Sequence, residues 1–358
     1  MNEKSICIAA ILAVFAATLS SPVLADLGVG TPVTIGKSYS IPAAAFDGER
    51  RITVRLPPGY VEQPEMRFPV VYIIDGGPEQ DFPHIAGIVQ SRDMNYSFDR
   101  FILVGIETIN RRSELSPQVR TGAEDYYKEL LGATPGGADN FRSFIEADVK
   151  PWVEGNFRTT GHSAIMGESL AGLFVLETLL KQPALFDDWI AVSPSLWYDD
   201  MKLAREAADR LGSLTAGDER VYLSVANEGY RHEEGVERFV DSLRASAPAS
   251  LQWAYVPLDA SETHGTIYHT AALDAFRLLY GTTDREYRPH GEMLDGSLSG
   301  NDADQVLPEE QALLDAECNT QNSLRLTPGA AKMGRERLFY RCLRLDLGPV
   351  AREGTLGQ

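Results

Sequence analysis

Two patterns of apolar positions run along the chain. Residues 51–56 alternate polar and apolar side chains, which is typical of a strand with one covered face, and a Pro-Pro-Gly run at 57–59 ends this pattern. Residues 68–74 and 101–106 are continuous apolar runs, as expected of strands covered on both faces. Similar short runs predict further strands at residues 164–166, 189–192, 221–225 and 251–256.

Apolar residues with helical spacing separate these strands. In residues 140–153, Phe141, Phe144, Ile145 and Val149 fall on one face, which predicts a helix. The alternation of strands with helices predicts an α/β fold, with a mostly parallel sheet and helices on both of its faces. Further helices are predicted from residue 170 onwards and at residues 201–210, 232–245 and 267–279.

One serine stands where a short apolar run gives way to helical spacing. This context predicts a nucleophile elbow, a tight strand-to-helix turn that carries Ser169. The residues two before and two after the serine must be small so that the backbones can pass, and Gly167 and Ala171 are small. The string alone is a weak signal, so the interpretation depends on its strand, turn and helix context. A second string at 161–163 is rejected because Ile165 is bulky.

A serine hydroxyl becomes a good nucleophile when a histidine takes its proton and a carboxylate holds that histidine. In α/β hydrolases these groups follow in the order serine, acid, histidine, each just after a strand. His264 lies in the loop after the strand predicted at 251–256, so we predict that it is the base. We interpret His269 as a packing or surface residue inside the next helix. The remaining histidines are interpreted as loop or surface residues: His84, His162, His232 and His290.

The predicted acid is Glu228. It follows the strand predicted at 221–225 and lies between the serine and the histidine in the chain, as the α/β-hydrolase order requires. The alternative is that Glu228 is an ordinary solvated loop carboxylate. In that case the acid is one of four nearby residues: Glu233, Glu234, Asp199 or Asp200.

Acyl transfer also needs two backbone N–H donors for the oxyanion. The amide of Leu170 is one candidate, because it follows the nucleophile at the start of a helix. The amide of Gly77 is the other, because it lies in the glycine turn after strand 68–74 and the next residue, Pro78, has no N–H. An ordinary glycine turn is the alternative. No motif in the chain implies a cofactor.

The first 25 residues have the pattern of a signal peptide. Lys4 precedes a largely apolar stretch at 6–19, and the small Ala25 fits the end of a cleavage site. The alternative, a membrane anchor, needs about 20 apolar residues, and this stretch is shorter. We therefore expect a periplasmic or secreted protein, in which Cys318 and Cys342 can form a disulfide. Two unpaired thiols are the alternative, and two cysteines without a nearby histidine make no zinc site.

The predicted domain organisation has three parts. A signal peptide covers residues 1–25, and an α/β-hydrolase domain covers 26–283. Residues 284–358 are predicted to form a polar linker and a small C-terminal appendage pinned by the disulfide. The formal net charge of −18 argues against nucleic acid and anionic membrane surfaces as partners, because a grip on phosphates needs a basic face.

Four segments together resemble a known family. They are RITVRLPPGY at 51–60, FPVVYIIDG at 68–76, VGIETINRRSELSP at 104–117, and residues 157–197 with PALFDDWIAVSPSLW. The chain from residue 38 to 280 is similar to the Putative esterase family of α/β hydrolases, the group of esterase D, feruloyl esterases and siderophore trilactone esterases. The resemblance implies an α/β-hydrolase fold and supports Ser169, His264 and Glu228 as the catalytic residues. It is closest to the bacterial subgroup that hydrolyses ferric-siderophore esters.

The chain departs from the family pattern beside the nucleophile. Glu168 stands where the family usually has histidine, and Ala171 where it usually has glycine. Arg111 and Arg112 follow the third strand and are candidates to hold an anionic acyl group or a catecholate; surface ion pairs are the alternative.

These observations favour an exported serine carboxylic ester hydrolase that acts on a small-molecule ester through an acyl-enzyme. Two alternatives remain open: an acyltransferase or peptidase on the same triad, and a non-catalytic binding module on an esterase scaffold.

Overall fold

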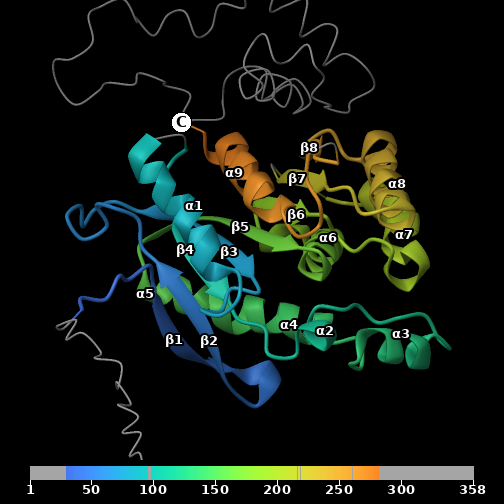
Figure 1. The fold of residues 1–358 in the computed structure, drawn as a ribbon, viewed down its shortest axis with the longest axis horizontal. Helices are drawn as coiled ribbons and strands as arrows, with labels where there is room; N and C mark the ends of the chain where they lie inside the picture. Colours follow the sequence, from blue (N-terminus) through green and yellow to red (C-terminus); the bar gives the residue numbers. More distant parts are fainter. Residues whose placement is uncertain (1–29, 96–97, 216, 218, 260, 282–358) are drawn as a thin grey trace, which may run out of the picture. The chain divides into compact units, whose positions relative to one another are not determined.

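A sheet of eight strands forms the centre of the structure (Figure 1). The computed structural model describes residues 30–281, except 96–97, 216, 218 and 260. The order of the strands is β1-β2-β4-β3-β5-β6-β7-β8; β2 pairs antiparallel with β1 and β4, and all other neighbours are parallel. The strands are β1 (Lys37–Ala43), β2 (Gly48–Arg55), β3 (Phe68–Ile74), β4 (Ile102–Ile106), β5 (Thr159–Glu168), β6 (Asp188–Val192), β7 (Arg220–Val225) and β8 (Gln252–Pro257).

Helices cover both faces of this sheet, as predicted. α1 (Phe82–Asn95) and α9 (Ile267–Tyr280) lie together on one face (Figure 1). Side chains of α4 to α8 form the core on the other face. The remaining helices are α2 (Arg111–Glu114), α3 (Glu124–Leu131), α4 (Ala138–Phe144), α5 (Lys150–Asn156), α6 (Leu170–Lys181), α7 (Tyr198–Gly212) and α8 (Tyr230–Ser246).

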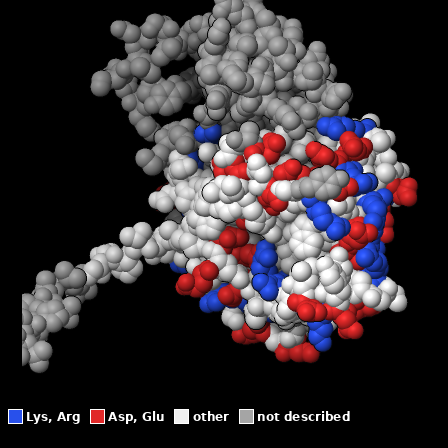
Figure 2. Space-filling view, turned by 45° about the vertical axis from the view of Figure 1, so that its right-hand side comes forward, with Lys and Arg blue, Asp and Glu red and all other residues white. Residues whose placement is uncertain are grey.

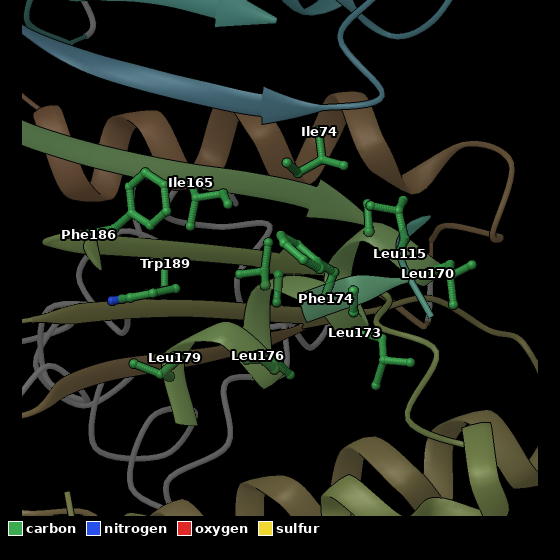
Figure 3. Close-up of a cluster of buried hydrophobic side chains, with 14 of the residues drawn as sticks. Ile74, Leu115, Ile165, Leu170, Leu173, Phe174, Leu176, Leu179, Phe186 and Trp189 are labelled. Carbon is green, nitrogen blue, oxygen red and sulfur yellow. The ribbon is translucent and has the colours of Figure 1, made fainter. Parts of the chain in front are cut away.

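Strand β3 shows why the apolar runs are continuous. Its side chains alternate between two hydrophobic cores: Val71 and Ile73 pack toward α1 and α9, whereas Tyr72 and Ile74 pack toward α6. A strand buried on both faces has no position for a polar side chain, so the polar alternation of β2 disappears. Figure 3 shows the α6 side of the sheet, where Ile165, Phe174 and Trp189 belong to one cluster of buried side chains.

Two details of the fold differ from the sequence prediction. The helix predicted at 140–153 is confirmed as a continuous helical segment, but it is not a regular α-helix, because a π-helical turn (Ile145–Val149) lies between α4 and α5. Pro151 lies in the first turn of α5 and has no N–H to donate, and a regular α-helix would bring its ring against the carbonyl four residues earlier. Strand β1, at the antiparallel edge of the sheet, was not predicted from the sequence. Most of its positions are exposed and it contains Pro42, so a search for apolar runs does not detect it.

Charged residues of both signs are interspersed over the face shown in Figure 2. Along α7 and α8 opposite charges pair, as in Arg210 with Glu206 and Arg238 with Glu234. Among the described residues, none of the helices has both the length and the apolar composition for a bilayer crossing.

The predicted signal peptide, the Cys318–Cys342 pair and the appendage at 284–358 lie outside the described residues. The chain splits by its internal contacts into two units, residues 1–34 and residues 35–358. Every helix and strand named above belongs to the second unit.

Candidate active site

Ser169 occupies a strained turn between β5 and α6. Its backbone has φ 61° and ψ −118°, a conformation that costs a non-glycine residue about 1–3 kcal/mol. Neighbouring backbone holds it there: Ser169 N–H donates to the carbonyl of Val192 (2.9 Å), and its own carbonyl accepts from Ser195 N–H (2.9 Å). The strand, sharp turn and helix predicted from the sequence are therefore present, and they place the serine at the carboxyl edge of the sheet.

The small residues around Ser169 are needed for this turn. A Cβ added at Gly167 would lie 2.7 Å from the Cβ and carbonyl carbon of Ala171, closer than real atoms approach. At Gly172 it would lie 3.0 Å from Pro194 Cα. Close backbone packing of β5, α6 and the loop after β6 thus explains the glycine that precedes the serine by two positions.

His264 and Glu228 meet at the same edge of the sheet. Glu228 follows β7 and His264 follows β8, and His264 Nδ1 lies 2.7 Å from Glu228 Oε2. The two loops are in register because Asn227 forms an isolated parallel bridge with Thr263 and its N–H donates to the Glu262 carbonyl (3.0 Å). An ionised carboxylate only accepts hydrogen bonds, so Nδ1 carries the hydrogen and Nε2 is left free to take a proton.

Burial and hydrogen bonds shift the pKa values of Glu228 and His264. Burial raises the pKa of Glu228, but hydrogen bonds from His232, His264 and Ser193 outweigh it and lower the pKa to about 2. The hydrogen bond to Glu228 raises the pKa of His264, against the opposing effect of burial. The Glu228 side chain is 6% exposed and the His264 side chain 46%, so the carboxylate is shielded and the imidazole faces solvent.

His232 is a residue that sequence reasoning missed. The prediction that it is a loop or surface residue is wrong: it is buried in the first turn of α8, with Nδ1 2.9 Å from Glu228 Oε2. Its spacing of four from Glu228 is a signal that could have found it, because residues i and i+4 come together at a helix start.

Glu168 lies beside the nucleophile in a setting that disfavours its charge. Burial raises the pKa of Glu168 to about 7; Asp81 and Glu228 add to this effect, whereas His264 and Arg111 oppose it. A carboxyl group with this pKa is about half protonated at neutral pH and can donate as well as accept a hydrogen bond.

The two predicted arginines have different surroundings. Arg111 Nε donates to Asp75 Oδ2 (2.6 Å), and its Nη2 is 3.4 Å from the Glu168 carbonyl, so it lies next to the elbow. Arg112 Nη1 donates to the Leu131 carbonyl (2.7 Å) and braces the end of α3 instead. The structure thus brings Arg111, but not Arg112, against the nucleophile turn.

The two candidate oxyanion donors also differ. Leu170 is the first residue of α6, so its N–H has no acceptor within the helix. Gly77 N–H donates to Gln80 Oε1 (3.0 Å), and the Gln80 amide in turn donates to the Thr108 carbonyl (2.9 Å). The Gly77 amide is therefore occupied by a side chain that would have to move before it could bind an oxyanion.

Comparison with known proteins identifies a matching family and several relatives. Residues 43–240 match the family described as Putative esterase. The chain is 29% identical to YbbA of Bacillus subtilis over 194 residues, which cover 53% of this chain and 73% of YbbA. It is 41% identical to the ferri-bacillibactin esterase BesA of Bacillus subtilis over 81 residues, which cover 22% of this chain and 28% of BesA.

A solved structure supports the fold over a longer stretch. An IroE-like serine hydrolase from Shewanella oneidensis superposes with a TM-score of 0.64 at 22% identity, covering 87% of this chain and 99% of that one. With an elbow serine, a histidine–carboxylate pair at the same edge of the sheet and more than half of the sequence matched, the chain belongs to the Putative esterase family of α/β hydrolases and is a carboxylic ester hydrolase.

Proposed function

We propose that this protein is an exported serine esterase in which Ser169, His264 and Glu228 form the catalytic triad. The observation that carries the proposal is the 2.7 Å hydrogen bond between His264 and Glu228, at the sheet edge where Ser169 sits in its strained turn. The order serine, acid, histidine and the position of each residue after a parallel strand match the α/β-hydrolase arrangement.

The tautomer of His264 defines the proton path. Nε2 takes the proton from the Ser169 hydroxyl as its oxygen attacks the ester carbonyl, and Glu228 stabilises the imidazolium that forms. That imidazolium then protonates the leaving alcohol, which leaves an acyl group on Ser169. Water, deprotonated by the same histidine, attacks the acyl-enzyme and releases the acid. The Leu170 amide binds the oxyanion, and the Gly77 amide joins it once Gln80 turns away.

A ferric-siderophore ester is the substrate class that we propose. BesA is named as a ferri-bacillibactin esterase, which supports the ferric form of the substrate. The chain also matches an apo-salmochelin esterase of Escherichia coli at 26% identity over 205 residues; this name denotes an iron-free siderophore and supports the siderophore ester alone. The iron in such a substrate is cargo of the ligand and takes no part in ester cleavage. Arg111 would offer a positive charge to an anionic acyl group, because it lies beside the elbow and its side chain is 38% exposed.

Export is proposed from the sequence of residues 1–25 alone. A disulfide between Cys318 and Cys342 would form in the same oxidising compartment. Mass spectrometry of the protein recovered from a bacterial periplasm would test both proposals, because cleavage and disulfide formation change the mass.

The first test of the mechanism is labelling with a fluorophosphonate probe followed by peptide mapping. We expect the label on Ser169 and none in Ser169→Ala. Ser143→Ala, at an exposed position of α4, is the control and should label like the wild-type protein. Equal labelling of Ser169→Ala, in protein with an unchanged melting temperature, would contradict the mechanism.

The two arginines offer a matched test of the substrate class. Arg111→Ala should raise KM for an anionic catecholate ester roughly tenfold relative to a neutral ester, because a charge-assisted contact is lost. Arg112→Ala should leave this ratio unchanged, since Arg112 contacts the Leu131 carbonyl. Equal effects on both esters in Arg111→Ala would argue against anionic recognition at this position.

A further inference from the structure

We propose that Ser195 is a further catalytic residue, whose hydroxyl contacts the nucleophile and speeds release of the acyl group from Ser169. The inference rests on the proposed acyl-enzyme mechanism and deepens it. Ser195 Oγ lies 3.3 Å from Ser169 Oγ, and either oxygen can be the donor of this hydrogen bond. Within the described part of the chain, Ser195 is the one hydrogen-bond partner of the Ser169 hydroxyl.

The backbone fixes Ser195 beside the elbow. Ser195 lies in the loop after β6, where its N–H donates to the Ser169 carbonyl (2.9 Å) and its carbonyl accepts from Tyr198 N–H (3.0 Å). The same loop packs closely on α6, because a Cβ added at Gly172 would lie 3.0 Å from Pro194 Cα. Ser195 is 3% exposed, whereas Ser169 is half-buried. The loop therefore presents a buried, fixed hydroxyl to the nucleophile.

Acylation of Ser169 weakens this contact. The free serine hydroxyl both donates and accepts hydrogen bonds. In the acyl-enzyme its proton has passed through His264 to the leaving alcohol, so Ser169 Oγ has nothing to donate. The same oxygen is now the alkoxy oxygen of an ester, whose lone pair is delocalised into the carbonyl group, and it accepts weakly. Whichever hydroxyl donates in the free enzyme, the buried Ser195 hydroxyl loses most of its hydrogen bond in the acyl-enzyme, which is unfavourable.

The contact returns during deacylation. Attack of water on the acyl carbon ends the delocalisation, and collapse of the tetrahedral intermediate leaves the electron pair of the broken bond on Ser169 Oγ, which His264 then protonates. The negative charge that develops on Oγ makes it a strong acceptor for the Ser195 hydroxyl. A separation of 3.3 Å is long for two hydroxyls and leaves room for this bond to shorten. Ser195 therefore stabilises the transition state of deacylation more than the acyl-enzyme, and such a difference raises the rate.

The two half-reactions should respond differently to the loss of this hydroxyl. Acylation starts from the free enzyme, in which the contact is already present, so its removal affects ground state and transition state together. In Ser195→Ala we expect the deacylation rate constant to fall about threefold to tenfold and the acylation rate constant by no more than about twofold. For an activated ester whose deacylation limits turnover, kcat and KM should then fall together, with kcat/KM nearly unchanged.

Pre-steady-state kinetics with an activated short-chain ester measure both rate constants. Quenching the reaction in acid at successive times and mass spectrometry of the Ser169 peptide follow the acyl group directly, per molecule that was acylated. Ser195→Thr keeps the hydroxyl and should recover most of the deacylation rate. The matched control is Ser242→Ala, which removes a buried serine hydroxyl of α8 that donates to the Arg238 carbonyl (2.9 Å). It should change neither rate constant.

The outcomes separate catalysis from structure. A purely structural role of Ser195 would lower the melting temperature and the fraction of protein that acylates, but not the deacylation rate of the molecules that do. An unchanged deacylation rate in Ser195→Ala, or equal falls in acylation and deacylation, would overturn the proposal. If Ser169→Ala keeps full turnover, the proposed triad itself fails. If Ser169→Ala is inactive and Ser195→Ala deacylates like the wild-type protein, only the role of Ser195 fails.

Discussion

The two ends of the sheet each hold a histidine bound to a carboxylate at 2.7 Å, yet only one of them has the features of a catalytic pair. At the carboxyl edge His264 contacts Glu228, and at the amino edge His162 contacts Asp188. A serine, Ser163, even follows His162 directly in the chain. The residue types are the same at both ends, so other properties must distinguish them.

The ring nitrogens are the first difference. His264 uses Nδ1 for its carboxylate, and its Nε2 has no hydrogen-bond partner among the described residues, whereas His162 uses Nε2. The second difference is the set of other donors bound to the carboxylate. Arg220 already binds both oxygens of Asp188, at 2.6 and 2.8 Å, and Tyr280 donates a hydrogen bond to Asp188 at 2.8 Å. The amino-edge pair is thus part of a saturated structural network.

The serines differ as well. Ser169 sits at positive φ at the start of a helix, whereas Ser163 lies within β5 and is buried. Lys150 Nζ donates to the Ser163 hydroxyl (2.8 Å) and also to the Leu185 carbonyl (2.8 Å). Strain, access and an unoccupied ring nitrogen therefore matter more for this chemistry than the presence of serine, histidine and acid.

Removal of the two serine hydroxyls should have very unequal effects. Ser169→Ala should lower kcat by a factor of about 10⁶, because no group replaces the nucleophile. Ser163→Ala should keep kcat per folded molecule within about threefold and cost stability instead, since the Lys150 ammonium loses a buried acceptor. Steady-state kinetics with an activated short-chain ester and thermal melting measure both. A large loss of kcat in Ser163→Ala would break the distinction between the two ends.

Neutralising Glu228 should lower activity, whereas neutralising Asp188 should lower stability. Glu228→Gln should lower kcat about 10⁴-fold with a nearly unchanged fold, because the amide no longer stabilises the imidazolium. Asp188→Asn should instead cost about 3–5 kcal/mol of unfolding free energy, because it leaves Arg220 without its buried counter-charge. Urea unfolding and kcat measured on the same preparations give the two quantities.

The amino-edge pair should also show in the pH dependence of stability. Burial lowers the pKa of His162, but the hydrogen bond to Asp188 and the charges of Asp188 and Asp187 outweigh it and raise the pKa. This stabilisation is therefore present at low pH and is lost as pH rises through the raised value. Burial raises the pKa of Asp188, but His162 and Arg220 outweigh it and lower the pKa, so its share is lost as pH falls through that value. If Asp188→Asn showed the same pH dependence as wild type, the pair would not be the origin of it.

The sequence was informative where one local pattern determines the structure, and uninformative where distant segments meet. The elbow at Ser169 could be predicted because strand, turn and helix are contiguous, and the continuous apolar runs report burial on both faces of the sheet. The partners of His232 could not, since the Ser193 carbonyl that orients its ring comes from a different loop. Likewise, nothing local shows that Gln80 covers the Gly77 amide or that Arg112 turns away to Leu131.

The smallest predicted effect concerns Glu168, which has no counterpart at the amino edge. Its negative charge raises the pKa of His264, and its own pKa is raised to about 7, mainly by burial. In Glu168→Gln the acidic limb of kcat/KM should therefore move slightly to lower pH. Activity at pH 6 relative to pH 8 should rise by no more than about twofold, because the Glu168 carboxyl is already mostly protonated at pH 6 in the wild-type protein. Glu237→Gln, exposed on α8, is the control and should leave the profile unchanged.

This shift is opposite in sign to the one expected for Arg111→Ala, since one substitution removes a negative neighbour of His264 and the other a positive one. The two profiles, measured with the same ester from pH 5 to 9, therefore test whether the limb belongs to His264. Opposite displacements would identify His264 as the titrating base, because Glu168 and Arg111 shift its pKa in opposite directions. If neither substitution moved the acidic limb, the limb would belong to a group other than His264. The His264–Glu228 pair would then no longer be distinguished from the His162–Asp188 pair as the catalytic one.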